Sequence, residues 1–382
     1  MTKTYDTIIC GGSLAGSAAG ISLARQGFSV AILDRERFPR NKLCGGLLTW
    51  KSIRLLESLF GETPESLTRS GAINHTSDRY SIRTLSQPLA EGSLSFPFHF
   101  VDRTLFDDLL LSRAREAGAE VFQETPVTAC DPIKGVVTCR DGRTFQGRYV
   151  IGADGANSVV RNSFPFLDRD RIKRFMAPTI EIKVSKEALP RPLKNPELYV
   201  GFMNAGYGWV FPNRDRIIVG ICGLRRNNIN FSQVFKDYLD FLEIKSDAIP
   251  DLRGHPLPYG NYLENPVHGV TLLAGDAGGF VEPLLGEGIF FALCTGMYAG
   301  QAVAQALTTG THPGTAYRVR LNRYVMPELK GSNILRWTLF RGVQWFGSAS
   351  LRWFIRMAGT QLGDMVHGKR SYRWLRKKHW DF

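Results

Sequence analysis

Hydrophobic residues at the beginning of the chain fall into two short runs, separated by a segment of small and apolar residues. Residues 7–10 and 28–33 have the continuous apolar character of buried strands. Residues 14–26 between them suit a helix that Gly27 ends. The pattern therefore predicts a strand–turn–helix–strand unit, and an acid, Asp34, directly follows its second strand.

Two amphipathic stretches farther along predict helices. Residues 51–60 form a short one, and residues 101–121 contain a longer helix that Gly118 ends. Asp102 is the expected N-cap of the longer helix, and Leu105, Leu109 and Ala114 are expected on its inner face. Short strands are predicted at residues 120–122, 136–139 and 270–274.

Three segments are rich in strand-forming residues without helices between them. Residues 73–100, 175–184 and 197–224 therefore predict one antiparallel sheet in a second domain, inserted into the first. We expect an α/β chain in three parts: a Rossmann-type domain of residues 1–72, 100–165 and 266–330, an inserted antiparallel-sheet substrate domain of residues 73–99 and 166–265, and a C-terminal helical tail of residues 331–382.

The first predicted turn carries candidate ligand chemistry. Gly11, Gly12 and Gly16 precede or open the first helix, and Asp34 lies 23 residues after Gly11, close to the spacing of about 20 in the dinucleotide fingerprint. Glycines let the backbone approach a pyrophosphate, and the helix N-terminus attracts its charge. Ser13 occupies the position of the second fingerprint glycine. The unit predicts a dinucleotide site; the alternative is a βαβ unit without a nucleotide.

A basic loop follows Asp34 and leads to Cys44. This cysteine precedes Gly45 and Gly46, which permit the close approach of a flat ring. The thiol is either a small buried hydrophobic group or a group that faces a cofactor.

Two further aspartates come directly after predicted strands. In a doubly wound sheet, ligands bind at the carboxyl ends of the strands, where Asp154 and Asp276 would lie. An ordinary capping role is the alternative for Asp154. After Asp276, a glycine-rich loop that includes residues 283–288 leads into a long helix, whose N-terminus would favour an anionic group above the loop.

Aromatic residues alternate along residues 206–212. Tyr207, Trp209 and Phe211 therefore share one face of a strand. They form either a contact between sheet and helix in the core or an aromatic wall above an apolar ligand.

Bulk composition excludes several kinds of site. The 382-residue chain has six dispersed cysteines without a CxxC pair, which favours a reducing compartment and predicts neither a metal site nor a disulfide framework. We predict no signal peptide and, because we find no apolar run of about 18 residues, no transmembrane helix.

The net charge of +13 is concentrated at the C-terminal end, because residues 331–382 contain ten Lys or Arg and two Asp. Arginines there alternate with aromatic residues, so the tail is expected either to pack on the body or to lie at a lipid interface. No nucleic-acid module is recognised, and we predict no nucleic-acid partner. The expected location is cytoplasmic, peripheral on the inner face of the membrane if the tail binds lipid. The aromatic residues are Trp337, Phe340, Trp345, Phe346, Trp353, Phe354, Trp374 and Trp380.

Four stretches in order resemble the flavoprotein hydroxylase superfamily of the para-hydroxybenzoate hydroxylase type, which binds FAD. They are the fingerprint with Asp34, Arg103 on its helix, residues 153–155 and the Gly275–Asp276 pair. The resemblance implies that the fingerprint holds the ADP half. It also implies that Asp276 contacts the ribityl chain or pyrophosphate, and that residues 283–288 run beside the isoalloxazine.

Within this superfamily, the segments FPRNKLCGG, GYGWVFP and EPLLGEGI resemble the geranylgeranyl reductase family. Its members bind FAD and reduce isolated double bonds of prenyl chains on lipids or chlorophyll precursors. The family motif PxxYxWxFP is matched by Tyr207, Trp209, Phe211 and Pro212, but Asn204 replaces its first proline. Cys44 matches a cysteine that lies near the flavin in archaeal members, which favours a thiol that faces the cofactor.

The resemblance implies an FAD-dependent oxidoreductase that transfers hydride from reduced flavin to an isoprenoid-like chain, with a nearby acid such as Cys44 protonating the other carbon. An external reductant such as NAD(P)H, ferredoxin or quinol would dock transiently, because the chain has one dinucleotide fingerprint. The expected catalytic residues are Cys44, Tyr207, Trp209, Gly286 and Gly288. The expected cofactor-binding residues are Gly11, Gly12, Ser13, Ala15, Gly16, Asp34, Arg35, Cys44, Gly45, Arg103, Asp154, Gly275, Asp276, Pro283, Gly286, Gly288 and Ile289.

Two other functions remain alternatives. An FAD-dependent monooxygenase or halogenase would use oxygen on an apolar or aromatic substrate, and the halogenase motif WxWxIP resembles residues 207–212. Halogenases also need an early active-site lysine, and the absence of lysine between Lys51 and Lys134 argues against one here. A non-catalytic flavin or lipid carrier at the membrane surface is the second alternative.

Overall fold

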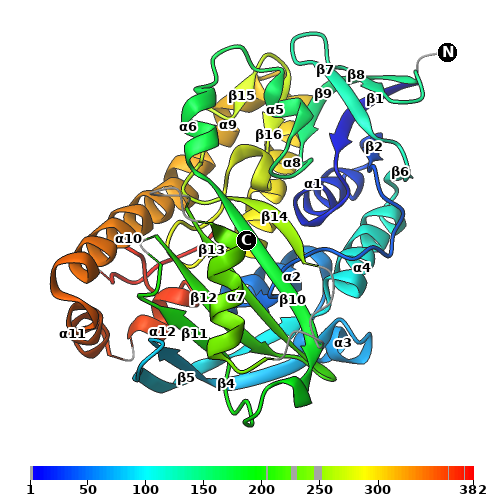
Figure 1. The fold of residues 1–382 in the computed structure, drawn as a ribbon. Helices are drawn as coiled ribbons and strands as arrows, with labels where there is room; N and C mark the ends of the chain where they lie inside the picture. Colours follow the sequence, from blue (N-terminus) through cyan, green and yellow to red (C-terminus); the bar gives the residue numbers. More distant parts are fainter. Residues whose placement is uncertain (1–2, 204, 225–229, 245–251, 360, 374) are drawn as a thin grey trace.

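The strands of the computed structural model form two eight-stranded sheets across its described residues, which are 3–203, 205–224, 230–244, 252–359, 361–373 and 375–382. In Figure 1 the first sheet occupies the upper part of the molecule and most of the second lies below it, with α10 and α11 along the left edge. The α-helices are α1 Leu14–Ala24, α2 Trp50–Phe60, α3 Pro64–Arg69, α4 Arg103–Glu116, α5 Val159–Asn162, α6 Arg169–Arg174, α7 Phe231–Phe241, α8 Ile289–Thr309, α9 Pro313–Arg320, α10 Met326–Phe346, α11 Ser348–Ala358 and α12 Gln361–Val366.

The first sheet has the parallel centre of a doubly wound fold. β1 pairs in parallel with β2 on one side and with β9 on the other, so Thr7 lies opposite both Val30 and Tyr149. β6 and β16 extend this parallel centre, and β15 and the β7–β8 hairpin add antiparallel pairs. The predicted α/β class is confirmed. The strands are β1 Lys3–Cys10, β2 Val30–Leu33, β6 Glu120–Phe122, β7 Val127–Asp131, β8 Val136–Cys139, β9 Thr144–Gly152, β15 Val267–His268 and β16 Thr271–Leu273.

The second sheet has the order β14-β10-β13-β12-β11-β4-β5-β3. It is antiparallel except where β4 pairs with β11, which corrects the expectation of a wholly antiparallel sheet. A parallel pair needs a crossover connection, and the segment between β5 and β10, which carries β6 to β9 of the first sheet, lies on the path that links the two strands. The strands are β3 Leu47–Leu48, β4 Ile73–Arg83, β5 Pro88–Val101, β10 Met176–Ser185, β11 Glu197–Val200, β12 Gly206–Pro212, β13 Arg216–Gly223 and β14 Arg253–Pro258.

Alternating residues divide the second sheet into two faces. Ile217, Val219 and Ile221 of β13 belong to the core cluster that includes α7 residues, whereas Ile218 and Cys222 belong to a different cluster on the opposite face. That opposite face also carries Tyr207, Trp209 and Phe211 of β12. The period of two therefore sends one set of side chains towards α7 and the other towards the side where Trp337 and Phe340 of α10 pack.

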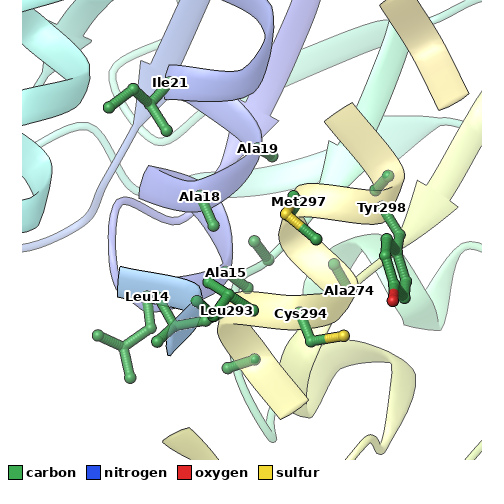
Figure 2. Packing of buried hydrophobic residues seen from close by; sticks show 14 of the residues in the cluster. Leu14, Ala15, Ala18, Ala19, Ile21, Ala274, Leu293, Cys294, Met297 and Tyr298 are labelled. Atoms are coloured by element: carbon green, nitrogen blue, oxygen red, sulfur yellow. The ribbon is translucent and has the colours of Figure 1, made fainter. Parts of the chain in front are cut away.

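Helices α1 and α8 pack closely through small residues, as Figure 2 shows for Ala15, Ala18 and Ala19 beside Leu293 and Met297. A Cβ at Gly296 would overlap the backbone of Ala15, so glycine allows this approach. By length and composition, α8 could cross a membrane, which the search for an apolar run did not reveal. However, 89% of its most apolar 18-residue stretch is buried inside the fold. Its environment is that of a core helix.

Helix α4 confirms the predicted cap, because the Asp102 side chain accepts a hydrogen bond from Thr104 N. The expected inner face was wrong at one position. Leu105 is exposed, whereas Phe106, Leu110 and Ala114 are buried. Spacings of three and four residues define the buried stripe, and Leu105 lies beside it.

The C-terminal segment is part of the body of the protein. Helix α10 begins at Met326, ahead of the predicted tail, and a π-helical turn, Leu321–Val325, joins it to α9. The final residues fold back onto α8, where the Trp380 ring lies 4.6 Å from the ring of Phe290 and Tyr298 Oη donates to Asp381 O. Trp374 lies outside the described residues.

Candidate active site

The turn between β1 and α1 has the close backbone contacts of a phosphate-binding turn. Gly11 has a φ of +101°, and a Cβ there would overlap the carbonyl oxygen of Ala153. A Cβ at Gly16 would overlap the carbonyl oxygen of Gly11. Both positions therefore require glycine. Ala15 is buried behind the turn, against Gly275 and Gly296.

Asp34 lies at the end of β2 and is anchored to the turn. Its Oδ2 accepts a hydrogen bond from Gly12 N at 2.6 Å, and its Oδ1 accepts one from Glu36 N at 2.9 Å. A carboxylate oxygen can accept more than one hydrogen bond, so room remains for ribose hydroxyls. Arg35 is exposed and pairs with Glu36 at 3.3 Å.

Ser13 differs from the fingerprint glycine without blocking the helix terminus. Its hydroxyl donates to Asp107 Oδ2 at 2.8 Å and accepts from Arg103 Nη2 at 3.4 Å, and it does not cap α1. The side chain is therefore bound towards α4, and the N–H groups at the start of α1 are left for an anion.

Positive charge is in surplus beside this turn. Arg103 binds Asp107 through two hydrogen bonds of 2.6 and 2.9 Å, and Arg40 Nη2 lies 3.3 Å from the same carboxylate. Burial lowers the pKa of nearby Lys42, and repulsion from Arg103 adds to this effect. Arg40, Lys42 and Arg103 are three cations, whereas only two carboxylates, those of Asp107 and Asp276, act on Lys42. This imbalance favours a bound anion such as a pyrophosphate.

The two strand-end aspartates have different surroundings. The Asp154 carboxylate accepts hydrogen bonds from Ser158 Oγ and from the N–H groups of Val159 and Val160, so it caps the start of α5. Burial raises the pKa of Asp154. Asp276 lies in the 3₁₀ turn Gly275–Gly278 after β16, and its Oδ1 would be 3.8 Å from a Cβ at Gly288. Asp276 therefore faces the start of α8.

The loop before α8 is held in one conformation by a buried carboxylate. Glu282 accepts hydrogen bonds from Leu284 N and Leu285 N at 2.7 and 2.6 Å, and Ser332 Oγ of α10 also donates to it. Burial raises the pKa of Glu282 to about 7. Pro283 O accepts a hydrogen bond from Arg336 Nη1 of α10 at 3.2 Å. The loop is therefore tied to helix α10.

Gly286 occupies a position in this loop that excludes a side chain. Its φ is +69°, and a Cβ would lie 2.9 Å from Tyr207 Oη, which donates to Leu285 O. Gly288 precedes α8, whose first residue, Ile289, is buried. The loop and the aromatic strand β12 therefore meet directly.

A cavity of about 470 Å³ lies against the loop. Cys44, Gly45, Gly286, Gly288 and Ile289 line one part of it. The cavity extends along the interior face of the second sheet to apolar side chains of α10, α11 and α12. Its volume lies within the range of about 300–1,000 Å³ that ligand sites occupy. These lining residues on the tail are Leu339, Phe340, Val343, Leu351, Phe354, Ile355, Leu362, Met365 and Val366.

The alternating aromatic residues share this cavity. The ring centroids of Tyr207 and Trp209 lie 5.8 Å apart, and those of Trp209 and Phe211 lie 6.3 Å apart. A Cβ at Gly45 would lie 2.8 Å from the Phe211 ring, so the Cys44–Gly45 loop contacts the same wall. The arrangement favours the aromatic wall over the alternative of a sheet–helix core contact. Asn204 lies outside the described residues.

Sequence reasoning missed three polar residues on the cavity wall: Thr179 and Glu181 of β10, and His255 of β14. Each has a buried side-chain atom without a hydrogen-bond partner among the described residues, namely Thr179 Oγ1, Glu181 Oε2 and His255 Nε2. The signal in the sequence was the alternation of polar and apolar residues through residues 179–184. Such alternation normally marks a solvent-facing side.

These features fit the FAD that the resemblance implies. The glycine turn and the surplus of cations suit a diphosphate, and the loop at Gly286–Gly288 borders a cavity with apolar walls. Unpartnered polar atoms on the wall leave hydrogen bonds for a polar ring or a substrate to complete.

Comparison with known proteins gives the family. The FAD binding domain family matches residues 4–229. A geranylgeranyl diphosphate reductase of Rhodobacter capsulatus is 32% identical over 322 residues, which cover 80% of this chain and 76% of that protein.

Two solved structures share the fold. A geranylgeranyl bacteriochlorophyll reductase-like protein of Thermoplasma acidophilum has a TM-score of 0.77 at 18% identity and covers 98% of both chains. A flavin-dependent brominase has a TM-score of 0.73 at 20% identity, over 96% of this chain and 92% of the other. At these identities the likeness concerns the fold alone. With the sequence matches above, the chain belongs to the geranylgeranyl reductase family of FAD-dependent oxidoreductases.

Proposed function

We propose that this enzyme reduces carbon–carbon double bonds of a prenyl, isoprenoid-like lipid chain. The observation that carries the proposal is the shape and lining of the cavity. One part holds Cys44, Gly286 and Gly288, and the rest runs along Trp209 and Phe211 to the apolar side chains of the tail helices. A long unbranched or methyl-branched hydrocarbon fits such a lining better than a small polar substrate does.

Bound FAD in its reduced form supplies the hydride for one alkene carbon. The chain's own residues hold the substrate and exclude water. Tyr207 and Trp209 border the slot, and the missing side chains of Gly286 and Gly288 leave room for the alkene to reach the ring. The other carbon needs a proton, and Cys44 and Glu181 both lie on the cavity wall.

An anaerobic experiment tests this function. The FAD-loaded enzyme is reduced with dithionite and mixed with a geranylgeranyl lipid, and the flavin spectrum and the lipid mass are followed together. We expect the flavin to reoxidise while the lipid gains a pair of hydrogens for each reduced double bond. A flavin that stays reduced until air enters would contradict the proposal and favour a monooxygenase or halogenase, the chemistry of the brominase that shares the fold.

We propose that an external donor supplies the electrons, because the fingerprint at residues 11–16 serves FAD. NAD(P)H, a reduced ferredoxin and a quinol are the candidate classes. Stopped-flow reduction of the oxidised enzyme by each donor, without oxygen, identifies the donor as the one that bleaches the flavin at the rate of steady-state turnover.

We also propose peripheral contact with the cytoplasmic face of a membrane through the α10–α11 corner. Trp345 and Trp353 are 73% and 66% exposed there, and Arg341 and Arg356 lie exposed beside them. Aromatic and basic side chains on one surface suit an anionic lipid interface. This corner adjoins the helices that close the cavity, so a lipid chain would enter directly from the bilayer.

Vesicle sedimentation tests the membrane contact. The variant W345A/W353A should bind anionic vesicles more weakly than the wild type. The control is I133A, because Ile133 is an exposed apolar residue on the first domain. Equal binding by all three proteins would contradict the proposed surface. Truncation of the tail is unsuitable, because its helices line the cavity.

A further inference from the structure

Glu181 is a buried acidic residue at the cavity wall, and only one of its two carboxyl oxygens has a hydrogen-bond partner among the described residues. The residue is 2% exposed, and its Oε1 accepts a hydrogen bond from Cys44 N at 3.1 Å. Its Oε2 is buried without a hydrogen-bond partner among the described residues. Burying a polar atom without a partner costs about 1–3 kcal/mol, and more when it is charged. Oε2 therefore carries a proton or meets a ligand.

The register of the second sheet places Glu181 in line with the aromatic wall. Glu181 pairs with Gly220 on β13, and Gly220 pairs with Trp209 on β12. A Cβ at Gly220 would overlap the indole ring, so Trp209 lies over the glycine. Only a position without a side chain therefore separates the carboxyl group from the ring that borders the proposed substrate slot.

The neighbouring row of the sheet carries further unpartnered atoms. His255 on β14 pairs with Thr179 on β10, and Thr179 pairs with Cys222 on β13. Thr179 Oγ1 and His255 Nε2 are buried without hydrogen-bond partners among the described residues, as Glu181 Oε2 is. All three residues line the cavity. The polar patch faces into the space that an apolar substrate would share with a ring.

We propose that Glu181 is the acid that protonates the double bond during reduction. This proposal rests on the proposed function. In the balanced step, one alkene carbon accepts a hydride with its electron pair from the reduced flavin, which is left oxidised. The other carbon forms a C–H bond with the proton of Glu181 Oε2 as the O–H bond breaks. The resulting carboxylate regains a proton from solvent before the next turnover.

The groups around Glu181 are consistent with this role. Burial raises its pKa to about 7, although Lys183 on the same strand, Cys44 N–H and Arg103 of α4 act to lower it. Burial lowers the pKa of His255 to about 4, and Lys42 adds to this effect, so His255 is neutral near pH 7. A general acid works best when its pKa lies near the working pH.

Cys44, the acid expected from the sequence, has a different environment. Its Sγ accepts a hydrogen bond from Gly46 N at 3.4 Å. Its backbone N–H holds Glu181 Oε1. This geometry gives Cys44 a positioning role for the carboxyl group, while its thiol interacts with Gly46 N–H and with the guanidinium of Arg103.

The test uses the full-length, FAD-loaded variant Glu181→Gln, which keeps an oxygen to accept from Cys44 N but has no acidic proton. With a geranylgeranyl lipid under anaerobic conditions, we expect flavin reoxidation to slow by about 100-fold or more. The wild-type rate should fall as the pH rises above about 7, and the variant should lose this fall. Glu181→Asp should recover part of the rate.

A second readout does not depend on turnover. Infrared spectra of the wild type without lipid should show the C=O stretch of a protonated carboxyl group that disappears as the pH rises through about 7. Glu181→Gln should lack this band, and Glu282→Gln identifies the band of the other buried glutamate with a raised pKa. The matched control for turnover is Glu197→Gln, because Glu197 is buried in the same sheet but bonded to Arg191.

The outcomes separate this proposal from the proposed function. Glu181 is supported as the acid if Glu181→Gln loses the fast rate, its pH dependence and the infrared band. Glu197→Gln should keep the rate and the pH dependence of the wild type. This proposal is overturned if Glu181→Gln keeps the turnover rate and pH profile of the wild type while Cys44→Ala loses turnover. The reductase function would then remain intact. A wild type that never reoxidises with prenyl lipids overturns both.

Discussion

Replacing Lys51 with methionine should destabilise the protein by about 3–5 kcal/mol, because the change leaves the Glu287 carboxylate, whose side chain is only 10% exposed, without its cation. Lys51 on α2 is 1% exposed, and its Nζ lies 2.6 Å from Glu287 Oε2. The same Nζ donates to Val366 O at 3.0 Å and lies 5.2 Å from the centre of the Phe290 ring. Glu287 stands between Gly286 and Gly288 in the loop that borders the cavity.

The double variant K51M/E287Q measures how much of this loss comes from the unpaired charge. A glutamine at position 287 is neutral and still accepts a hydrogen bond from Thr49 Oγ1, which donates to Glu287 at 2.9 Å. The double variant still loses the hydrogen bond to Val366 O and the contact with the Phe290 ring. We expect it to be more stable than K51M by about 1–3 kcal/mol.

Urea unfolding followed by far-ultraviolet circular dichroism, at one saturating FAD concentration, gives the free energy of unfolding for each variant. For a 382-residue chain that unfolds as one unit, the entropy at the midpoint is about 0.8 kcal/mol per degree, so K51M should lower Tm by about 4–6 °C. A loss below about 1 kcal/mol in K51M, or a double variant no more stable than K51M, would refute the argument.

Two further predictions follow from the loop and its buried carboxylate. G286A should weaken FAD binding by about tenfold, because its Cβ would press on Tyr207 Oη. G142A, at φ +82° with open space around it, shares only the backbone strain of about 1 kcal/mol and should keep its FAD affinity in a fluorescence titration. The folded-state pKa of Glu282 is raised to about 7 from 4.5, so between these pH values the folded protein keeps a proton that the unfolded chain has lost. The free energy of unfolding should therefore fall on the order of 3 kcal/mol as the pH rises from about 4.5 to about 7. Urea unfolding at several pH values should show this decrease in the wild type and not in E282Q. The same decrease in E282Q would show that Glu282 does not titrate in this range.

Local patterns in the sequence were sufficient to predict several elements in the first third of the chain. The apolar runs predicted β1 and β2, and Asp102 caps α4 as expected. These predictions succeeded because a strand period, a helix cap and a glycine with positive φ depend on neighbouring residues. The same reasoning placed Tyr207 and Trp209 on one face before the sheet was known.

Local sequence patterns could not predict the role of the polar residues in the strands of the second sheet. Glu181 occupies an alternate position in a strand, where a polar side chain usually meets water. Here both faces of the sheet are covered, one by α7 and the other by the cavity and the tail helices. Which face receives Glu181 depends on the packing of segments far apart in the chain.

By itself, the sequence determined the glycine turn between β1 and α1 with Asp34 after β2, the alternation of aromatic residues on β12 and the family to which the chain belongs. Only the tertiary structure decided that the tail helices close the cavity and that Glu181 and His255 reach its wall. The physical reason is that turn conformation and strand alternation are set by residues close together in the chain. Burial and the pKa of a carboxyl group are set by whichever distant elements exclude water from it.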